Sequence, residues 1–149
     1  MTVPSMSRRR FNRLSLIALL GAGSSLSGAA SVLQGPTASP SSRRDVIKQQ
    51  LPGEPPRELT LVEVTYPPGA GSPAHLHANG VMAFVVSGTI ASKVGDELEQ
   101  TFKTGDAWWE PPGAVHRMSR NASSTEPAVL LAIYIAPKGV GRANLMRPI

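Results

Sequence analysis

The chain has 149 residues, a length that suits one domain, and it contains 14 Gly, 14 Pro and no Cys. The lack of Cys excludes disulfides, iron–sulfur clusters, thiolate zinc sites and cysteine nucleophiles. The net charge of +5 is concentrated in residues 1–30, which carry four Arg and no acidic residue, so the rest of the chain is close to neutral. We therefore expect no nucleic-acid partner, because the body of the protein has no basic stripe.

Residues 1–30 have the pattern of an export signal peptide. A basic segment, 7–13, precedes a short apolar run, 14–20, and then a stretch of small residues. Cleavage is expected after Ala29 or Ala30. The apolar run is too short to span a bilayer, so we expect no stable membrane anchor once the signal is removed.

The basic segment resembles a twin-arginine signal. Ser7, Arg8, Arg9 and Phe11 match that pattern, whereas Asn12 stands where an apolar residue is usual. An ordinary secretory signal is the alternative. Both routes predict an exported bacterial protein, periplasmic or extracellular, and the twin-arginine route would allow a metal to be loaded before export.

Residues 31–42 read as a flexible Pro/Ser/Gly linker, and residues 43–149 are expected to form the folded domain. From Arg43 onward the sequence predicts short strands and no helix. The strands are expected around Val46, at 57–66, around His75, and at 81–87, 89–94, 98–103, 107–110, 114–119 and 128–136. Short strands at regular spacing, ended by Gly and Pro turns, are typical of an all-β sandwich or barrel.

Two of these strands are apolar on both faces. The runs 81–86 and 129–135 alternate between two sets of apolar side chains. A strand in a small monomeric barrel needs only one buried face, so something must cover the other. We expect either the N-terminal segment or a second subunit to do so, and favour a homodimer.

Three His occur in the whole chain: His75, His77 and His116. Side chains at positions i and i+2 of a strand lie on the same face, so the imidazoles of His75 and His77 can meet one metal ion. Imidazole binds Fe, Zn, Cu, Ni and Mn, so the residue type does not select the metal. Spacing alone does not show whether His116 joins the pair, and a strand His is often only a surface or hydrogen-bonded residue.

The region around the first two His resembles the first motif of the cupin superfamily. That motif has a Gly, five residues, His-x-His, three or four residues, Glu, six residues and a Gly. Here the corresponding residues are Gly69, His75, His77, Val81 and Gly88, with the same spacing. Val81 therefore stands in the position of the family's Glu.

The second cupin motif is matched around the third His. It has a Gly, five residues, Pro-x-Gly, two residues, His, three residues and Asn. This sequence has Gly105, Pro111, Gly113 and His116 at those spacings, with Arg120 in place of Asn. Two motifs in the expected order imply a single cupin-type antiparallel β-barrel or jelly roll, with its motif core at 69–121.

The resemblance implies one divalent transition metal ion held by His75, His77 and His116. Neither Val81 nor Met82, which covers the alternative spacing, replaces the missing carboxylate. We therefore expect either a neutral three-His site or a degenerate site with weak or no metal. Three-His iron occurs in some cupin-type dioxygenases, so iron is the first expectation, with Mn, Ni, Cu or Zn as alternatives. A neutral donor set would leave the full metal charge to attract an anionic or bidentate substrate.

Strand parity predicts which side chains line the pocket. Val81, Ala83 and Val85 should face inward with the His pair, and Met118 and Arg120 share the parity of His116. Arg120 could meet a carboxylate, although a solvated Arg at a strand end is the alternative. The resulting cavity would be mostly apolar, as ligand pockets tend to be.

Glu110 is the acidic residue nearest to the second motif. We keep it as a substitute ligand or as an acceptor for an imidazole N–H. Trp108 and Trp109 are adjacent in a strand, so one should point inward and the other outward.

Two functions follow from these residues. One is an exported, metal-dependent dioxygenase or related oxidoreductase acting on a small molecule at the three-His site. The alternative is a non-catalytic cupin module that binds a small metabolite or a metal, because one fold hosts many activities.

Overall fold

A computed structural model describes residues 40–149, so the expected signal peptide and residues 31–39 of the expected linker lie outside the described part. Within it the chain forms eleven strands and one helix of four residues. The elements are β1 (Ser42–Leu51), β2 (Arg57–Tyr66), β3 (Gly71–Ser72), β4 (His75–Leu76), β5 (Val81–Ser87), β6 (Thr89–Val94), β7 (Gln100–Lys103), β8 (Ala107–Glu110), β9 (Val115–Asn121), β10 (Ala128–Pro137), α1 (Arg142–Leu145) and β11 (Arg147–Pro148).

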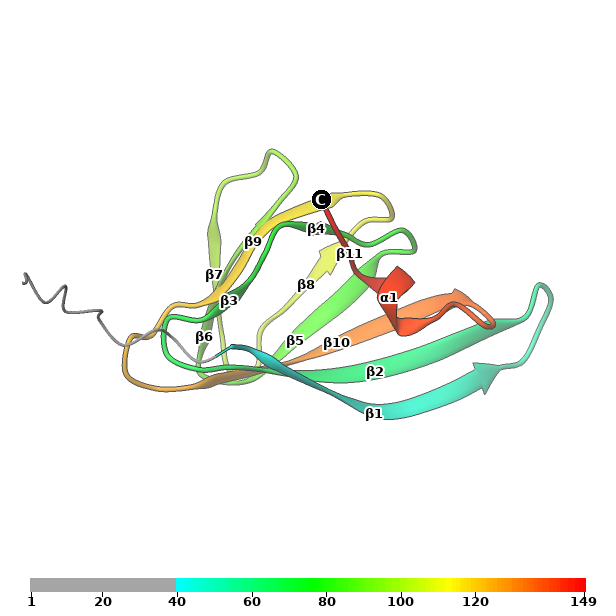
Figure 1. Ribbon diagram of the computed structural model, residues 1–149, viewed down its shortest axis with the longest axis horizontal. Coiled ribbons are helices and arrows are strands. Elements are labelled where there is room, and N and C mark those ends of the chain that lie inside the picture. The colour runs from blue at the N-terminus through cyan, green and yellow to red at the C-terminus, as the bar shows by residue number, and fades with distance from the viewer. Residues whose placement is uncertain (1–39) are drawn as a thin grey trace, which may run out of the picture. The chain divides into compact units, whose positions relative to one another are not determined.

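The strands form two antiparallel sheets. One has the order β1-β2-β10-β5-β8, and the other has the order β11-β4-β9-β6-β7, with β3 pairing on β9. Figure 1 shows β1, β2, β10 and β5 side by side, with β9, β6 and β7 standing across from them. Each sheet joins strands that are distant in sequence, as a double-sheet jelly roll requires. The expected all-β antiparallel barrel or jelly roll is confirmed.

The core lies between the inner faces of the two sheets. Side chains along β2, β5 and β10 alternate between buried and more exposed positions, the period of a strand with one covered face. Val85 and Ile90 are fully buried, and Leu130 packs in the same cluster. Each such side chain contributes roughly 1.5–3 kcal/mol through removal of its apolar surface from water.

The strands expected at 57–66, 81–87, 89–94 and 107–110 coincide with β2, β5, β6 and β8. Helix α1 was not expected, because four residues are too few to show a helical period. No helix in residues 40–149 is long and apolar enough to cross a membrane.

Candidate metal centre

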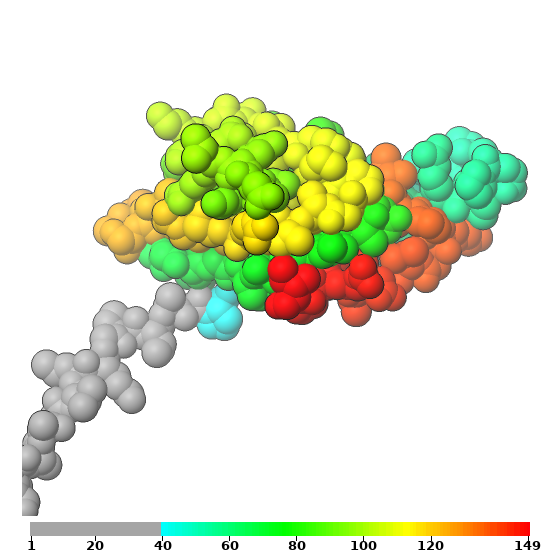
Figure 2. All heavy atoms as spheres, turned by 90° about the horizontal axis from the view of Figure 1, so that it is seen from above, coloured from blue at the N-terminus to red at the C-terminus, as the bar shows by residue number. Residues whose placement is uncertain are grey.

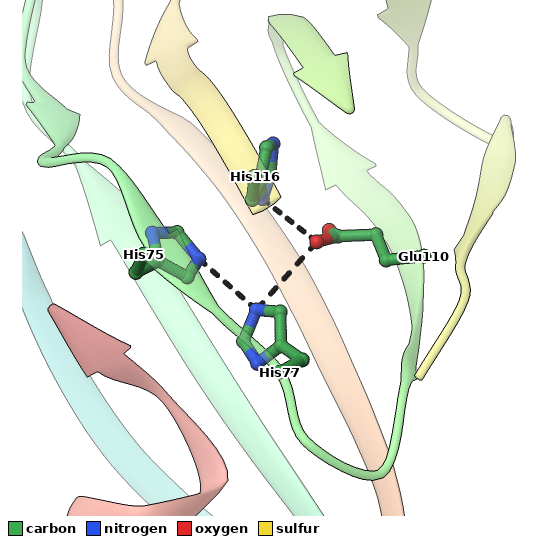
Figure 3. A group of neighbouring side chains, drawn as sticks. All are labelled: His75, His77, Glu110 and His116. Atoms are coloured by element: carbon green, nitrogen blue, oxygen red, sulfur yellow. Dashed lines mark hydrogen bonds and ion pairs between the residues drawn. The ribbon is translucent and has the colours of Figure 1, made fainter. Parts of the chain in front are cut away.

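The two His motifs meet on neighbouring strands. His75 on β4 is the cross-strand partner of His116 on β9, and His77 follows directly after β4. All three side chains are buried. The ring centroid of His75 lies 4.7 Å from that of His77 and 4.9 Å from that of His116. The structure therefore brings the three imidazoles together inside the barrel, as Figure 3 shows.

Backbone carbonyls fix the orientation of the first two imidazoles. Nδ1 of His75 lies 2.7 Å from the carbonyl oxygen of Pro73, and Nδ1 of His77 lies 2.6 Å from that of Leu145. A carbonyl oxygen only accepts, so in each ring Nδ1 carries the proton and donates it. The two Nε2 atoms then face each other at 3.0 Å with their lone pairs. Two lone pairs at that distance repel each other, and a metal ion bound by both would remove the repulsion.

Glu110 joins the imidazoles at the centre. It ends β8, and its carboxylate is buried with the three rings. Oε1 accepts a hydrogen bond of 3.0 Å from Nε1 of Trp108. Oε2 lies 2.9 Å from Nδ1 of His116 and 3.6 Å from Nε2 of His77, yet it forms no hydrogen bond. A buried carboxylate oxygen in ion-pair range but without a hydrogen bond is suited to a metal ion.

The strand register explains how Glu110 reaches the site. Its cross-strand partner is Val81 on β5, the position at which the first cupin motif has its Glu. Partners in an antiparallel pair have neighbouring side chains on one face, so position 110 can supply the carboxylate that position 81 lacks. From the sequence, Glu110 was expected as a substitute ligand or as an acceptor for an imidazole N–H, and only the pairing of β5 with β8 places it opposite Val81.

A glycine allows this close pairing. Gly80 precedes β5 with a φ of 74°, in the left-handed region that favours glycine. A Cβ at this position would lie 2.9 Å from the carbonyl oxygen of Glu110 and 2.9 Å from the ring of Trp109. A larger residue would therefore push the loop away from β8 and from the carboxylate.

The third imidazole is held by a serine. Nε2 of His116 lies 2.8 Å from Oγ of Ser92 on β6, which is buried. A hydroxyl can donate or accept, so Ser92 can hold the ring in either tautomer. Nδ1 of His116 faces Glu110.

These donors fit a divalent metal ion. One nitrogen or oxygen from each of the four residues lies within 4.8 Å of all the others. Imidazole nitrogens that bind one ion at about 2.0–2.1 Å are separated by roughly 3.0–3.4 Å, and the Nε2 atoms of His75 and His77 lie 3.0 Å apart. A cavity of 30 Å³ adjoins the group, which is room for an ion and one or two small ligands. The donor group therefore differs from the expected neutral set of three His, because the carboxylate of Glu110 is a fourth donor and adds a negative charge.

Burial favours the neutral form of two of the imidazoles, those of His75 and His77. It lowers the pKa of His75 from 6.5 to about 4, an effect that the neighbouring His77 and His116 reinforce. Burial also lowers the pKa of His77. Neutral imidazole is the form that binds a metal, so the site holds its ligands ready at neutral pH. Burial raises the pKa of Tyr134, which therefore keeps its proton.

The pocket lining on β5 matches the expectation in part. Val81 and Ala83 line the cavity beside the donor group. Val85 faces the same interior and is fully buried, but it packs in the apolar core instead of lining the cavity.

The parity prediction for β9 was wrong beyond His116. β6 pairs Val94 with His116 and Lys93 with Met118, so one residue of β9 bulges between them. Such an insertion reverses the faces of all later side chains. Ser119 is consequently buried and lines the cavity, whereas Met118 is only half-buried.

Arg120 is displaced from the site by the same bulge. Its side chain is exposed and forms an ion pair of 3.0 Å with Glu99. The alternative of a solvated Arg is therefore the observed one. Asn121, one place later, is buried and donates from Nδ2 to the carbonyl oxygens of Tyr66 and Glu126, so it ties together two loops.

The adjacent tryptophans point to opposite faces, as expected. Trp108 is half-buried, lines the cavity and stacks on Phe102 with ring centroids 4.5 Å apart. Trp109 is exposed on the other face of the sheet.

The comparisons with known proteins agree with this fold. Residues 62–134 match a family model described as a cupin domain, Cupin_2. The cupin superfamily is the family that these findings support. The matched segment of the cupin domain contains all four residues of the donor group. No match was found among curated proteins.

Solved structures show the same cupin fold at low identity. An uncharacterized conserved protein with a double-stranded β-helix domain from Klebsiella pneumoniae is 24% identical with a TM-score of 0.55, and covers 72% of this chain and 85% of its own. A cupin domain from Bordetella pertussis is 19% identical with a TM-score of 0.51, and the match covers 68% of this chain and 98% of that domain. A DMSP lyase structure is 21% identical with a TM-score of 0.51, covering 61% of this chain and 44% of its own. These likenesses concern the fold alone.

Proposed function

We propose that this chain is an exported, metal-dependent cupin oxidoreductase of the dioxygenase type, acting on a small molecule at the His75, His77, Glu110 and His116 site. One observation carries the proposal. The buried Oε2 of Glu110 has no hydrogen bond and lies among three imidazoles, and burial lowers the pKa of two of them, His75 and His77. Such a group is costly to the fold unless a cation balances it.

Iron is the metal we propose. Imidazoles with one carboxylate suit Fe²⁺ as well as Mn²⁺, Ni²⁺, Cu²⁺ and Zn²⁺, and no thiolate is present to favour a soft ion. Four protein ligands leave open positions on a six-coordinate ion, and a bound Fe²⁺ would supply activation of dioxygen and oxidation of a substrate held beside it.

The cavity residues favour redox chemistry over acid–base chemistry. The described titratable groups that line the cavity are the four proposed ligands, Arg43, Tyr66 and Tyr134. Burial raises the pKa of Tyr134, so it cannot serve as a base near neutral pH. An enzyme that relies on a protein side chain as general base would need such a group, whereas an oxygenase needs a dry, shaped site and open metal positions.

The test of the proposal combines metal analysis with dioxygen uptake. Wild-type protein loaded with Fe²⁺ should consume dioxygen with a substrate, screened first among thiols, diketones and catechols. H75A should lose both metal and turnover, whereas E99Q, which changes an exposed carboxylate of the same charge, should keep both. Metal binding without dioxygen uptake across the screen would favour the alternative, a binding module. Failure to bind any metal would refute the oxidoreductase and leave only a module that binds a small metabolite.

Export is proposed from residues 1–30 alone. The paired residues Arg8 and Arg9 are the feature that distinguishes the twin-arginine route. Replacing both by Lys should retain the protein in the cytoplasm if that route is used. Continued export of the double variant would favour the ordinary secretory route, and cytoplasmic wild-type protein would refute export.

A homodimer is proposed to cover the outer face of the five-stranded sheet. Five apolar side chains form a continuous row across all its strands. The row runs Trp109, Met82, Ile133, Leu61 and Ile47. At about 4.8 Å per strand it spans roughly 19 Å, and monomers rarely expose large contiguous apolar patches.

Charged side chains beside the apolar row could pair across an interface with a second copy of the chain. Arg44 and Glu63 form an exposed ion pair on β1 and β2, the strands that also carry Ile47 and Leu61. In a dimer with two-fold symmetry, Arg44 and Glu63 of each copy would lie at the rim of the interface. Sedimentation should show a dimer for the wild type and a monomer for M82K. A monomeric wild type would refute the dimer.

A further inference from the structure

A second hollow adjoins the metal cavity. It has a volume of 460 Å³, within the range of small-molecule sites. Arg43, Tyr134 and Met146 line both this groove and the metal cavity, so the two meet at these residues. Figure 2 shows the red C-terminal residues, which supply one wall of the groove, lying against the green and orange parts of the chain.

The wall of the groove is largely apolar. The apolar side chains are contributed by β2 and by the C-terminal segment of α1 and β11. They belong to Val62, Ala143, Leu145, Met146 and Pro148. The C-terminal segment is fixed in place, because β11 pairs with β4 and the carbonyl of Leu145 accepts from His77. The groove therefore suits the apolar body of a ligand.

Arg43 supplies a positive charge where groove and cavity meet. Nη2 donates a hydrogen bond of 2.7 Å to Oγ of Ser72. Oγ of Ser72 is also hydrogen-bonded to the hydroxyl of Tyr66 at 2.7 Å, and that hydroxyl donates to Ser119. The chain of hydroxyls tethers the guanidinium beside the site.

The charge of Arg43 has no acidic partner in residues 40–149. Arg44, Arg117, Arg120 and Arg142 each pair with a carboxylate, at 2.8–3.3 Å. Among the described arginines without such a pair, Arg43 is the one that lines the cavity and the groove. A guanidinium has five N–H donors, and only one of those of Arg43 is used by a described residue. Its remaining donors can take an anion in the two-pronged arrangement that carboxylates prefer.

Tyr134 adds a second donor at the same junction. Its side chain is buried, and no hydrogen bond to its hydroxyl is formed by residues 40–149. The ring centroid lies 5.5 Å from that of His77, so the phenol stands next to the donor group. A phenol that keeps its proton can only donate to an anion.

We propose that the junction of Arg43 and Tyr134 is a carboxylate subsite, and that the substrate is an organic monocarboxylate whose apolar body lies in the groove under α1. The inference rests on the proposed function, because only a catalytic site has a substrate. With a divalent ion on three imidazoles and Glu110, the centre keeps one net positive charge, and Arg43 adds another. The single negative charge of a monocarboxylate would balance one of these two positive charges and lie close to both.

The test uses octanoate and its neutral counterpart octanamide as probes. Binding to the metal-loaded protein is measured by calorimetry for the wild type, R43Q and R44Q. Arg44 is the matched control, because it is the adjacent residue and pairs with Glu63 on the surface. The wild type and R44Q should prefer octanoate, and R43Q should bind octanoate about 10- to 100-fold more weakly while octanamide binding stays unchanged.

Two further variants guard against a trivial explanation. R43K keeps the positive charge but loses the paired N–H donors of the guanidinium, so it should retain part of the preference for octanoate over octanamide. Y134F removes only the hydroxyl and should weaken octanoate binding by a smaller factor. Equal binding of acid and amide by the wild type, or an R43Q variant that binds octanoate as the wild type does, would overturn the proposal.

Metal content separates this inference from the proposed function. R43Q should keep the metal content of the wild type, since Arg43 is not among the proposed ligands. A protein that takes up no metal but still prefers octanoate through Arg43 would support the carboxylate subsite and refute the oxidoreductase. Loss of metal in R43Q would overturn the subsite as a separate feature.

Discussion

Replacing Glu110 by Gln removes one negative charge from the centre and keeps the shape of the side chain. The amide oxygen can still accept from Nε1 of Trp108, as Oε1 does now. The change is therefore confined to Oε2, the atom that lies 2.9 Å from His116 Nδ1 and 3.6 Å from His77 Nε2. Metal affinity should fall and the fold should remain.

The magnitude follows from the charges. At an effective dielectric constant of about 20, a unit charge roughly 4 Å from a divalent ion contributes about 8 kcal/mol. The cost of burying the carboxylate offsets several kcal/mol of this. A net loss of about 3–5 kcal/mol corresponds to a Kd roughly 150- to 5,000-fold weaker.

The assay is competition with a chromophoric chelator for Mn²⁺ and Zn²⁺ at neutral pH, with E99Q as the control for an exposed carboxylate. Thermal unfolding of the metal-free proteins is measured in parallel. E110Q without metal should be at least as stable as the wild type, because an unpaired buried charge has been removed. Unchanged metal affinity in E110Q together with a less stable metal-free protein would refute the reasoning and make Glu110 a structural ion-pair partner of His116.

Three other predictions follow from the same geometry. W108F removes the N–H that holds Oε1 of Glu110, so metal affinity measured by the same competition should fall about 10- to 100-fold, and an unchanged Kd would contradict this role. As the pH falls from 6.5 to about 4, the metal-free protein should lose up to roughly 3 kcal/mol of its free energy of unfolding, because His75 binds a proton in the unfolded chain but not in the folded one. Urea denaturation at several pH values measures this loss, and H75Q should make the stability less dependent on pH. G80A should destabilise the fold by about 1–3 kcal/mol in urea and also weaken metal binding, since a Cβ there meets Glu110 and Trp109; a stable variant with normal affinity would show that the loop adapts freely.

Much of this architecture can be read from the order of residues. The alternation in β2 and the Gly and Pro turns indicate short strands, because a strand with one covered face must repeat every second residue. The spacing of His75 and His77 places two imidazoles on one face for the same reason. These inferences depend on local geometry, which the sequence carries directly.

Other features depend on which strands become neighbours. Glu110 joins the centre because β8 pairs with β5 in a register that opposes it to Val81, and neither strand shows this alone. A single bulged residue on β9 turns Ser119 inward and Arg120 outward, and nothing in the local pattern marks it. Arg43 lies beside the site through the pairing of β1 with β2, far from both cupin motifs in sequence.

A metal centre at His75, His77, Glu110 and His116 requires that a metal ion be present in the protein as the cell makes it. Elemental analysis of the protein purified from its native compartment measures this. We predict about one equivalent of iron in the wild type and none in H116A. Wild-type protein from which the iron has been removed should take up one equivalent again when iron is added back. An absence of metal in the native protein, with none taken up on reconstitution, would contradict a metal centre at these residues.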